Sequence, residues 1–459
     1  IGCGGAGLRA AIEIKQSGLS LKVLGKRKKV DAHTVLAAGG VNAALGNLDP
    51  GDTWEKHFVD TFIEGYSLGD PYSVEIMTKN SPMRVNEIDK WGANFDKLSN
   101  GKLNQRYFGA HTFRRTCFSG DFTGQSILNT LLKKSESLGI PIIDNQYVTD
   151  LIIEDSQCFG AVSFDINTGE RNIHIANSVI LCTGGHTKIW KKSSSRKDEN
   201  TGDGILLGLK AGCEIIDMEM VQFHPTGMVL PLEMAGTLVT EAVRGEGGKL
   251  LNSRGERFMR NYDSLRMELS SRDMVALANY NEIIEGRGTK NDAVLLDISH
   301  KDKDFIINKI PKIYEQFMET QNKDISKEPM EVAPTAHYSM GGLLVSAHDH
   351  QTNIKGLFAA GEVVGGLHGA NRLGGNSLSE ILVFGQIAGK AASEFSKSQK
   401  LKFPSNKLIK KYNVNINKKI KNGKYDCTLL QQELSEIMWE YCGVVKENEK
   451  LNIGLKKLN

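Results

Sequence analysis

The first 26 residues combine closely spaced glycines with hydrophobic positions at helical spacing. The segment IGCGGAGLRAAIEIKQSGLSLKVLGK has glycines at 2, 4 and 7, an apolar helical pattern up to Gly18, and alternating hydrophobic residues at 19, 21 and 23. This order predicts a strand end, a glycine turn, a helix and a second strand. Such glycines let the backbone approach a pyrophosphate, and the helix N-terminus attracts its charge. The segment therefore predicts a dinucleotide site rather than a plain glycine turn.

The same alternation returns later in the chain. Residues 148–186 predict a meander of strands that ends in a glycine-rich turn at 183–185, and TGDGILLGLKAG predicts a helix closed by Gly212. Residues 218–330 are richer in Arg and Glu and carry helical patterns such as SRDMVALANYNEIIEGRG. Residues 356–392 then restore strand, glycine loop and helix. The first fold is therefore expected to be interrupted and resumed.

Composition and charge narrow the function classes. The chain has 459 residues, 40% hydrophobic, and its 57 basic and 54 acidic residues are mixed, which argues against a basic nucleic-acid-binding stripe. Seven cysteines without a CxxC pair argue against an iron–sulfur or zinc site built by this chain alone. No apolar run reaches the roughly 18–20 residues of a membrane-spanning helix. The chain begins at Ile1, so we expect it to be a fragment whose targeting signals are not readable.

Two local features raise the question of which cofactor binds. The second strand is followed by Gly25 and Lys26, where a simple NAD site usually has an acid that holds the ribose. A lone histidine, His33, precedes the Gly39–Gly40 pair in a run with little charge. Considered alone, His33 is more simply a residue that hydrogen-bonds a turn.

Six motifs change this interpretation. AHTVLAAGGVNAALG, QFHPTG, VTEAVRGEGG, SRD, HYSMGG and HGANRLGGNSL follow one another in this order. Together they resemble the flavoprotein subunits of succinate dehydrogenase and fumarate reductase, from Gly2 to about Leu455. The resemblance implies an α/β fold: a Rossmann-like FAD-binding domain (1–219 and 331–395), an inserted α+β capping domain (220–330) and a helical C-terminal region (396–459).

The resemblance also implies a role for His33. In this family the histidine of the HTV run is bonded covalently to the 8-methyl position of the flavin, although Ala32 stands where serine is common. Such a bond is expected to raise the flavin potential, which favours hydride acceptance from succinate. We therefore expect FAD, attached through His33.

The implied substrate site binds a dicarboxylate. An arginine clamp and imidazole or hydroxyl donors suit the two carboxylates of such a ligand. Arg272 matches the family's proton shuttle, relayed by Glu241 and Arg244, which lie three residues apart and share a face if helical. Each residue also has a structural interpretation, such as a helix-start ion pair between Arg272 and Asp273. The implied substrate-binding residues are His224, Thr240, His337 and Arg372.

The implied FAD site draws on most of the chain. Glu362, in AAGE, is a candidate for the ribose hydroxyls in place of the missing acid. No metal site is expected, and His348 and His350 in SAHDHQ are interpreted as a solvated loop. The implied cofactor residues are His33, Gly2, Gly4, Gly5, Gly7, Thr34, Gly39, Gly40, Thr183, Gly184, Asp203, Glu362, Ser377 and Leu378.

The expected reaction is oxidation of succinate to fumarate, or the reverse, with electrons passing through an iron–sulfur subunit to a quinone. The chain would sit peripherally beside membrane anchor subunits, on the cytoplasmic side of the membrane or on the matrix side in mitochondria. L-aspartate oxidase is the nearest alternative, but it generally lacks the histidine of HTV. A thiol-linked fumarate reductase and a catalytically silent flavin scaffold are further alternatives, although a silent scaffold predicts loss of Arg272 or Arg372. Family members also carry a further C-terminal region and a strand before Gly2, whose absence would put the first sheet in doubt.

Overall fold

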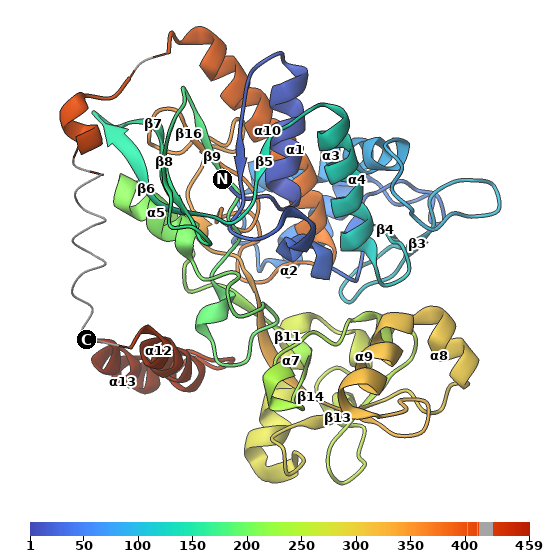
Figure 1. Cartoon of the computed structure of the whole chain (residues 1–459). Coiled ribbons are helices and arrows are strands. Elements are labelled where there is room, and N and C mark those ends of the chain that lie inside the picture. The colour runs from blue at the N-terminus through green and yellow to red at the C-terminus, as the bar shows by residue number, and fades with distance from the viewer. Residues whose placement is uncertain (402, 411, 413–425) are drawn as a thin grey trace.

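The computed structural model describes all residues except 402, 411 and 413–425. The chain forms a larger lobe, a smaller lobe and a separate pair of C-terminal helices (Figure 1). The larger lobe contains helices α1 (Gly5–Gln16), α2 (Trp54–Glu64), α3 (Pro71–Lys90), α4 (Thr123–Ser137), α5 (Asp203–Ala211) and α10 (Asn376–Ser398). Its strands are β1 (Val23–Leu24), β2 (Val41–Asn42), β3 (Gln105–Arg106), β4 (Thr116–Cys117), β5 (Ile142–Ile143), β6 (Gln146–Glu154), β7 (Gln157–Asp165), β8 (Arg171–Ile175), β9 (Val179–Leu181), β10 (Ile215–Ile216), β15 (Gly342–Leu343) and β16 (Leu357–Ala359).

Parallel strands form the centre of the larger lobe. β1 pairs with β5, and β9 pairs with β16, both in parallel. The first two residues join these pairs, because the Gly2 N–H donates to the Leu24 carbonyl and the Cys182 N–H donates to the Ile1 carbonyl. The meander β6–β7–β8 is antiparallel. The expected strand over 19–23 is thus shorter than predicted, since only Val23 and Leu24 pair.

Helices α1 and α10 pack closely because glycine removes the side chains between them. A Cβ atom on Gly385 would lie 2.8 Å from the Ala6 carbonyl oxygen, and one on Gly389 would lie 2.6 Å from that of Ala10. These contacts leave no room for a larger residue. They hold the N-terminal end of α1 beside the loops that build the site described below.

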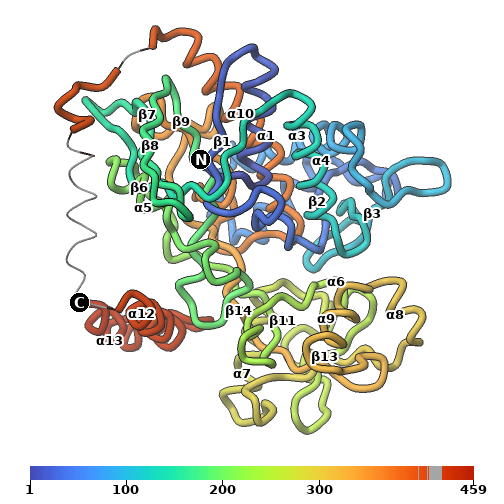
Figure 2. Tube along the Cα trace, viewed as in Figure 1, coloured from blue at the N-terminus to red at the C-terminus, as the bar shows by residue number. Residues whose placement is uncertain are grey.

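The smaller lobe is an antiparallel sheet covered by helices. Its strands, in the order β11–β14–β13–β12, are Val221–Met228, Met330–Ser339, Val294–Asp297 and Lys249–Leu251. Helices α6 (Ala242–Gly245), α7 (Arg272–Glu282), α8 (Lys303–Lys309) and α9 (Pro311–Gln321) complete it. β11 and β14 also run back to the larger lobe, where the chain crosses between the lobes (Figure 2). The expected domain boundaries at 219/220 and 330/331 lie just before β11 and at the first residue of β14.

The C-terminal helices α12 (Cys427–Tyr441) and α13 (Asn448–Leu458) pack beside the crossing strands. Trp439 lies edge-on to Phe223 with 6.2 Å between ring centroids, and the Trp190 indole N–H donates to the Cys442 carbonyl at 2.9 Å. Both helices fall in the expected helical region 396–459, of which residues 402, 411 and 413–425 lie outside the described part.

The interpretation of SAHDHQ as a solvated loop is wrong for His350. His348 is exposed, but His350 is only 3% exposed and stacks on Phe384 with a centroid distance of 4.2 Å. Its Nδ1 lies 2.8 Å from the Ala359 carbonyl oxygen, so the ring fills the core beside α10. Within the described ranges no group of His, Cys, Asp and Glu is arranged to hold a metal ion. Among the helices described, none is long and apolar enough to cross a membrane.

Candidate active site

A single cavity of about 330 Å³ joins the glycine-rich turn before α1 to the crossing strands of the smaller lobe. Both groups of predicted residues line it. From the cofactor set these are Gly2, Gly4, Gly5, His33, Thr34, Gly39, Gly40, Thr183, Gly184, Asp203, Glu362, Ser377 and Leu378, and from the substrate and catalytic set His224, Thr240, Glu241, Arg272, His337 and Arg372. Gly7 and Arg244 are not part of the lining. Gly7 instead allows close packing, since a Cβ there would lie 2.0 Å from the Gly2 carbonyl oxygen.

Two arginines meet at one end of the cavity through a shared acceptor. Gln222 Oε1 accepts from Arg272 Nη1 and from Arg372 Nη2, each at 3.1 Å. The Gln222 amide donates in turn to the Asn371 side chain at 2.6 Å and to the Arg372 carbonyl at 2.7 Å. Arg272 comes from the start of α7 and Arg372 from the loop before α10. A glutamine on β11 therefore sets the distance between two cations from different lobes.

The electrostatics of this end favour an anion. Arg372 is buried and lies over the Tyr338 ring, 4.1 Å from its centroid. Burial, reinforced by repulsion from Arg272, lowers the pKa of Arg372 to about 10. A ligand carboxylate would offset the burial of Arg372 by accepting the hydrogen bonds that water no longer accepts. Its negative charge would also offset the repulsion between Arg372 and Arg272.

His224 and His337 lie side by side on β11 and β14, with 5.2 Å between ring centroids. Burial and the neighbouring arginines hold the pKa of each ring well below its usual value, and His224 adds to this effect on His337. Both rings are thus neutral near pH 7. His224 Nδ1 accepts from the Thr226 N–H at 3.2 Å, and His337 Nδ1 lies 2.8 Å from the Ser194 hydroxyl. These contacts leave the Nε2 atoms as the nitrogens for a ligand.

Glu241 connects the arginines. Its Oε2 accepts from Arg272 Nε at 2.8 Å and lies 3.7 Å from Arg244 Nη2. Burial opposes ionisation of Glu241, but Arg272 and Arg244 outweigh it and lower its pKa to about 2. The helix-start pair between Arg272 and Asp273 is not observed, since Asp273 instead binds Tyr66 and Asn371. A chain of charged groups therefore runs from the cavity to buried Arg244, and its role as a proton relay stays a prediction.

Several residues of the site were missed by sequence reasoning. Gln222 lies inside the quoted QFHPTG motif, but a glutamine carries no charge that would single it out. Ser194 contacts His337 from a segment with no recognisable pattern, and Tyr338, which lies beneath Arg372, is part of the quoted HYSMGG motif but carries no charge that would single it out. The loop FGAHTFRRTCFSGDFTG supplies Phe108 to the lining and the Gly109 N–H, which donates to Glu241 Oε1 at 2.7 Å.

The opposite end of the cavity fits a dinucleotide. The turn from Gly2 to Ala6 faces the cavity, with the N-terminus of α1 behind it. The Thr183 hydroxyl is buried there without a hydrogen-bond partner among the described residues, so it is available to a ligand. At the end of β1, Lys26 Nζ pairs with Asp203 at 2.7 Å. Glu362 also lines the cavity, and its Oε1 accepts from the Ser339 N–H at 3.1 Å. Its role in binding the ribose stays a prediction.

His33 begins the short 3-10 helix η2 (His33–Leu36) and lines the same cavity. Its Nδ1 lies 3.0 Å from Glu199 Oε2. The ring thus has a carboxylate partner that the sequence did not indicate. The following residue, Thr34, accepts a hydrogen bond on Oγ1 from the Gly5 N–H at 3.0 Å and so ties this helix to the start of α1.

Comparison with known proteins agrees with this geometry. A family model described as an FAD binding domain matches residues 1–378. One chain of the fumarate reductase (CoM/CoB) of Methanothermobacter marburgensis is 43% identical over 100% of this chain and 83% of its own length. The succinate dehydrogenase flavoprotein subunit of Rickettsia bellii is 36% identical over 100% of this chain and 80% of its own length.

This chain belongs to the succinate dehydrogenase and fumarate reductase flavoprotein family. A solved quinol fumarate reductase of E. coli superposes with a TM-score of 0.93 at 33% identity, covering 100% of this chain and 80% of that one. The Mycobacterium smegmatis Sdh1 structure gives a TM-score of 0.88 at 40% identity over 100% and 78% of the two chains. The fold is therefore the α/β FAD-binding fold of this family, and the protein is an FAD-dependent oxidoreductase.

Proposed function

We propose that this chain interconverts succinate and fumarate with FAD bound in the cavity. The observation that carries the proposal is the pair Arg272 and Arg372, which share Gln222 in a cavity that continues to the dinucleotide turn. Two cations beside two neutral imidazoles suit a four-carbon dianion better than a monoanion. Bound FAD supplies the hydride acceptor or donor.

Each side chain has a definite task in this proposal. Arg372 clamps one carboxylate, while His224, His337 and Thr240 orient the other and so hold the central carbons in line for transfer. In the oxidative direction succinate loses a hydride from one central carbon and a proton from the other, which leaves fumarate. As that proton moves onto Arg272, Arg272 passes one of its own protons to Glu241, with Arg244 next in the relay, and the reverse sequence reduces fumarate.

The electrons leave or arrive through a partner. We propose an iron–sulfur subunit for this role, with membrane anchor subunits and a quinone beyond it, which would place this chain peripherally at a membrane. Its 43% identity to a chain of a fumarate reductase (CoM/CoB) favours a thiol-linked electron source as a second candidate. The dicarboxylate chemistry of this chain is the same in either case.

The direct test uses the purified FAD-loaded chain under anaerobic conditions. After stoichiometric reduction of the flavin with dithionite, we expect fumarate to restore the oxidised absorbance near 450 nm, and crotonate, which has one carboxylate, to leave it bleached. Recovery with crotonate, or none with fumarate, would contradict the proposal. Bleaching of the oxidised flavin by L-aspartate would favour the L-aspartate oxidase alternative.

We further propose that FAD is bonded covalently to His33, which lines the cavity. The new bond joins an imidazole nitrogen to the 8-methyl carbon; the imidazole and the methyl group each lose one proton, and the two electrons left on the flavin pass to fumarate. After acid denaturation we expect yellow flavin to remain with the polypeptide and a flavin peptide that contains His33. His33→Ala is expected to bind FAD but release all of it in acid. Release from the unaltered chain would remove this proposal without affecting the dicarboxylate site.

A further inference from the structure

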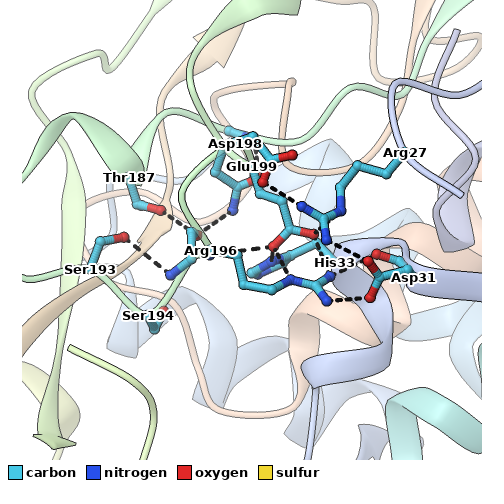
Figure 3. A network of polar contacts seen from close by, with 12 residues as sticks. Arg27, Asp31, His33, Thr187, Ser193, Ser194, Arg196, Asp198 and Glu199 are labelled. Carbon is cyan, nitrogen blue, oxygen red and sulfur yellow. Dashed lines mark hydrogen bonds and ion pairs between the residues drawn. The ribbon is translucent and has the colours of Figure 1, made fainter. Parts of the chain in front are cut away.

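A cluster of charged side chains lies against His33 (Figure 3), and its members Arg27, Asp198 and Glu199 also line the cavity. Glu199, from the loop between β9 and α5, approaches the ring at Nδ1. Glu199 is only 5% exposed. Because burial of a carboxylate is costly unless it is paired, the contact requires partners that keep Glu199 ionised.

Two arginines provide those partners. Arg196 donates through Nε to Glu199 Oε2 at 2.9 Å and forms a second contact with Oε1, while Arg27 Nε lies 3.6 Å from Oε1. Both arginines also bind the Asp31 carboxylate. Burial raises the pKa of Glu199, but His33 and Arg196 outweigh it and lower the value to about 2. Glu199 is therefore a carboxylate at any physiological pH.

The same arginines fix the backbone that carries the histidine. Arg196 Nη2 donates to the Asp31 carbonyl at 2.7 Å, two residues before His33. The frame thus orients both the imidazole, through Glu199, and its main chain, through Asp31. Within this partly exposed network only Glu199 is buried, and a buried carboxylate is not required for stability alone, since apolar packing serves that purpose as well or better.

The hydrogen bond has a chemical consequence for the ring. A carboxylate that accepts from Nδ1–H selects the tautomer in which Nε2 carries the lone pair. Within the described part of the chain, His33 Nε2 has no hydrogen-bond partner, and His33 lines the cavity. The nitrogen able to form a bond is then the one not occupied by Glu199.

We propose that Glu199 is a positioning residue: it holds His33 by Nδ1, and the frame of Arg27, Asp31 and Arg196 holds Glu199, so that Nε2 is presented to the cofactor. The inference rests on the proposed covalent attachment at His33 and adds the group that prepares this histidine for it.

Other charged groups also face His33. Burial lowers the pKa of His33, but Glu199 and then Glu362 raise it and Arg196 opposes them, with a net increase above the usual value. Without the Glu199 charge, burial and Arg196, which both lower the pKa of His33, have the larger effect. The pKa of His33 in Glu199→Gln is therefore expected to fall, so that the ring becomes neutral at lower pH than in the unaltered chain.

The test compares Glu199→Gln and Glu199→Asp with the matched control Asp198→Asn, which removes the adjacent exposed carboxylate. Asp198 pairs with Arg27 and has no contact with His33 among the described residues. Full-length chains from riboflavin-starved cells, free of FAD, are treated with diethyl pyrocarbonate, which modifies a histidine only in its neutral form. Modification of the His33 peptide is followed by mass spectrometry against pH. In Glu199→Gln we expect the midpoint to fall by about one pH unit, or about fivefold faster modification one unit below the original midpoint. Asp198→Asn should keep the original midpoint.

Covalent incorporation provides the second readout. After FAD is added together with fumarate as the electron acceptor, the acid-stable flavin should form at least about tenfold more slowly in Glu199→Gln, at an intermediate rate in Glu199→Asp, and at the original rate in Asp198→Asn. Equal midpoints and equal rates in the unaltered chain and Glu199→Gln would overturn the inference. If the unaltered chain forms no acid-stable flavin, covalent attachment fails, and the titration still decides whether Glu199 holds His33. If Glu199→Gln does not fold, as judged by its melting transition, Glu199→Asp decides both readouts.

Discussion

Substitution of Arg272 by lysine is expected to abolish nearly all turnover while dicarboxylates still bind. Lysine keeps the positive charge but lacks the planar fork that reaches Glu241 through Nε and Gln222 through Nη1. The proton relay therefore loses its link to the cavity. We expect the rate of fumarate reduction to fall by about 10³-fold or more, which is the order attributed to a positioned proton donor together with its charge.

The measurement is single-turnover reoxidation of the reduced flavin by fumarate, alongside the dissociation constant of malonate from its absorbance perturbation. Arg257→Lys is the matched control, because Arg257 also binds a carboxylate in the smaller lobe, that of Glu268, away from the cavity. It should retain the original rate. A full rate in Arg272→Lys would mean that the proton comes from another group.

Substitution of Arg372 by glutamine is expected to weaken binding rather than chemistry. The guanidinium is buried over Tyr338 and shares Gln222 with Arg272, so its charge is available to a ligand carboxylate without competition from water. Two charge-assisted hydrogen bonds contribute about 3–4 kcal/mol together. The dissociation constant of malonate should therefore rise by about 10²–10³-fold.

The selectivity of the variant gives an independent check. The unaltered chain should prefer malonate strongly over butyrate, whereas Arg372→Gln should lose most of this preference because one carboxylate has no clamp. Arg287→Gln, which alters an arginine bound to Glu282 in the smaller lobe and outside the cavity lining, should leave both constants unchanged. A malonate affinity unaffected by Arg372→Gln would show that the carboxylate binds elsewhere.

The sequence predicted much of the site because its residues belong to local patterns. Gly2, Gly4 and Gly5 stand where the backbone lines the cavity, and their close spacing is visible in the sequence. The substrate and catalytic residues lie in contiguous motifs with characteristic side chains, around His224, Glu241, Arg272, His337 and Arg372. The cavity brings these segments together from both lobes. Glu241, the N-cap residue of α6, lies 3.7 Å from Arg244 because a three-residue spacing at a helix start places both on one face.

Other features followed from packing between distant segments. His350 looked like part of a solvated loop because its neighbours are polar, yet the space beside Phe384 on α10 buries it. Gly7 looked like part of the cofactor turn, but its contact is the Gly2 carbonyl.

The sequence by itself determined the α/β alternation, the glycine turn before the first helix and the identity of the ionisable groups, because these depend on neighbours along the chain. Only the tertiary structure decided that Gln222 spaces two arginines and that Glu199 holds His33. These contacts join residues 50 to 166 positions apart. A hydrogen bond over such a separation leaves no periodicity in the sequence, since it is created when the lobes and loops pack.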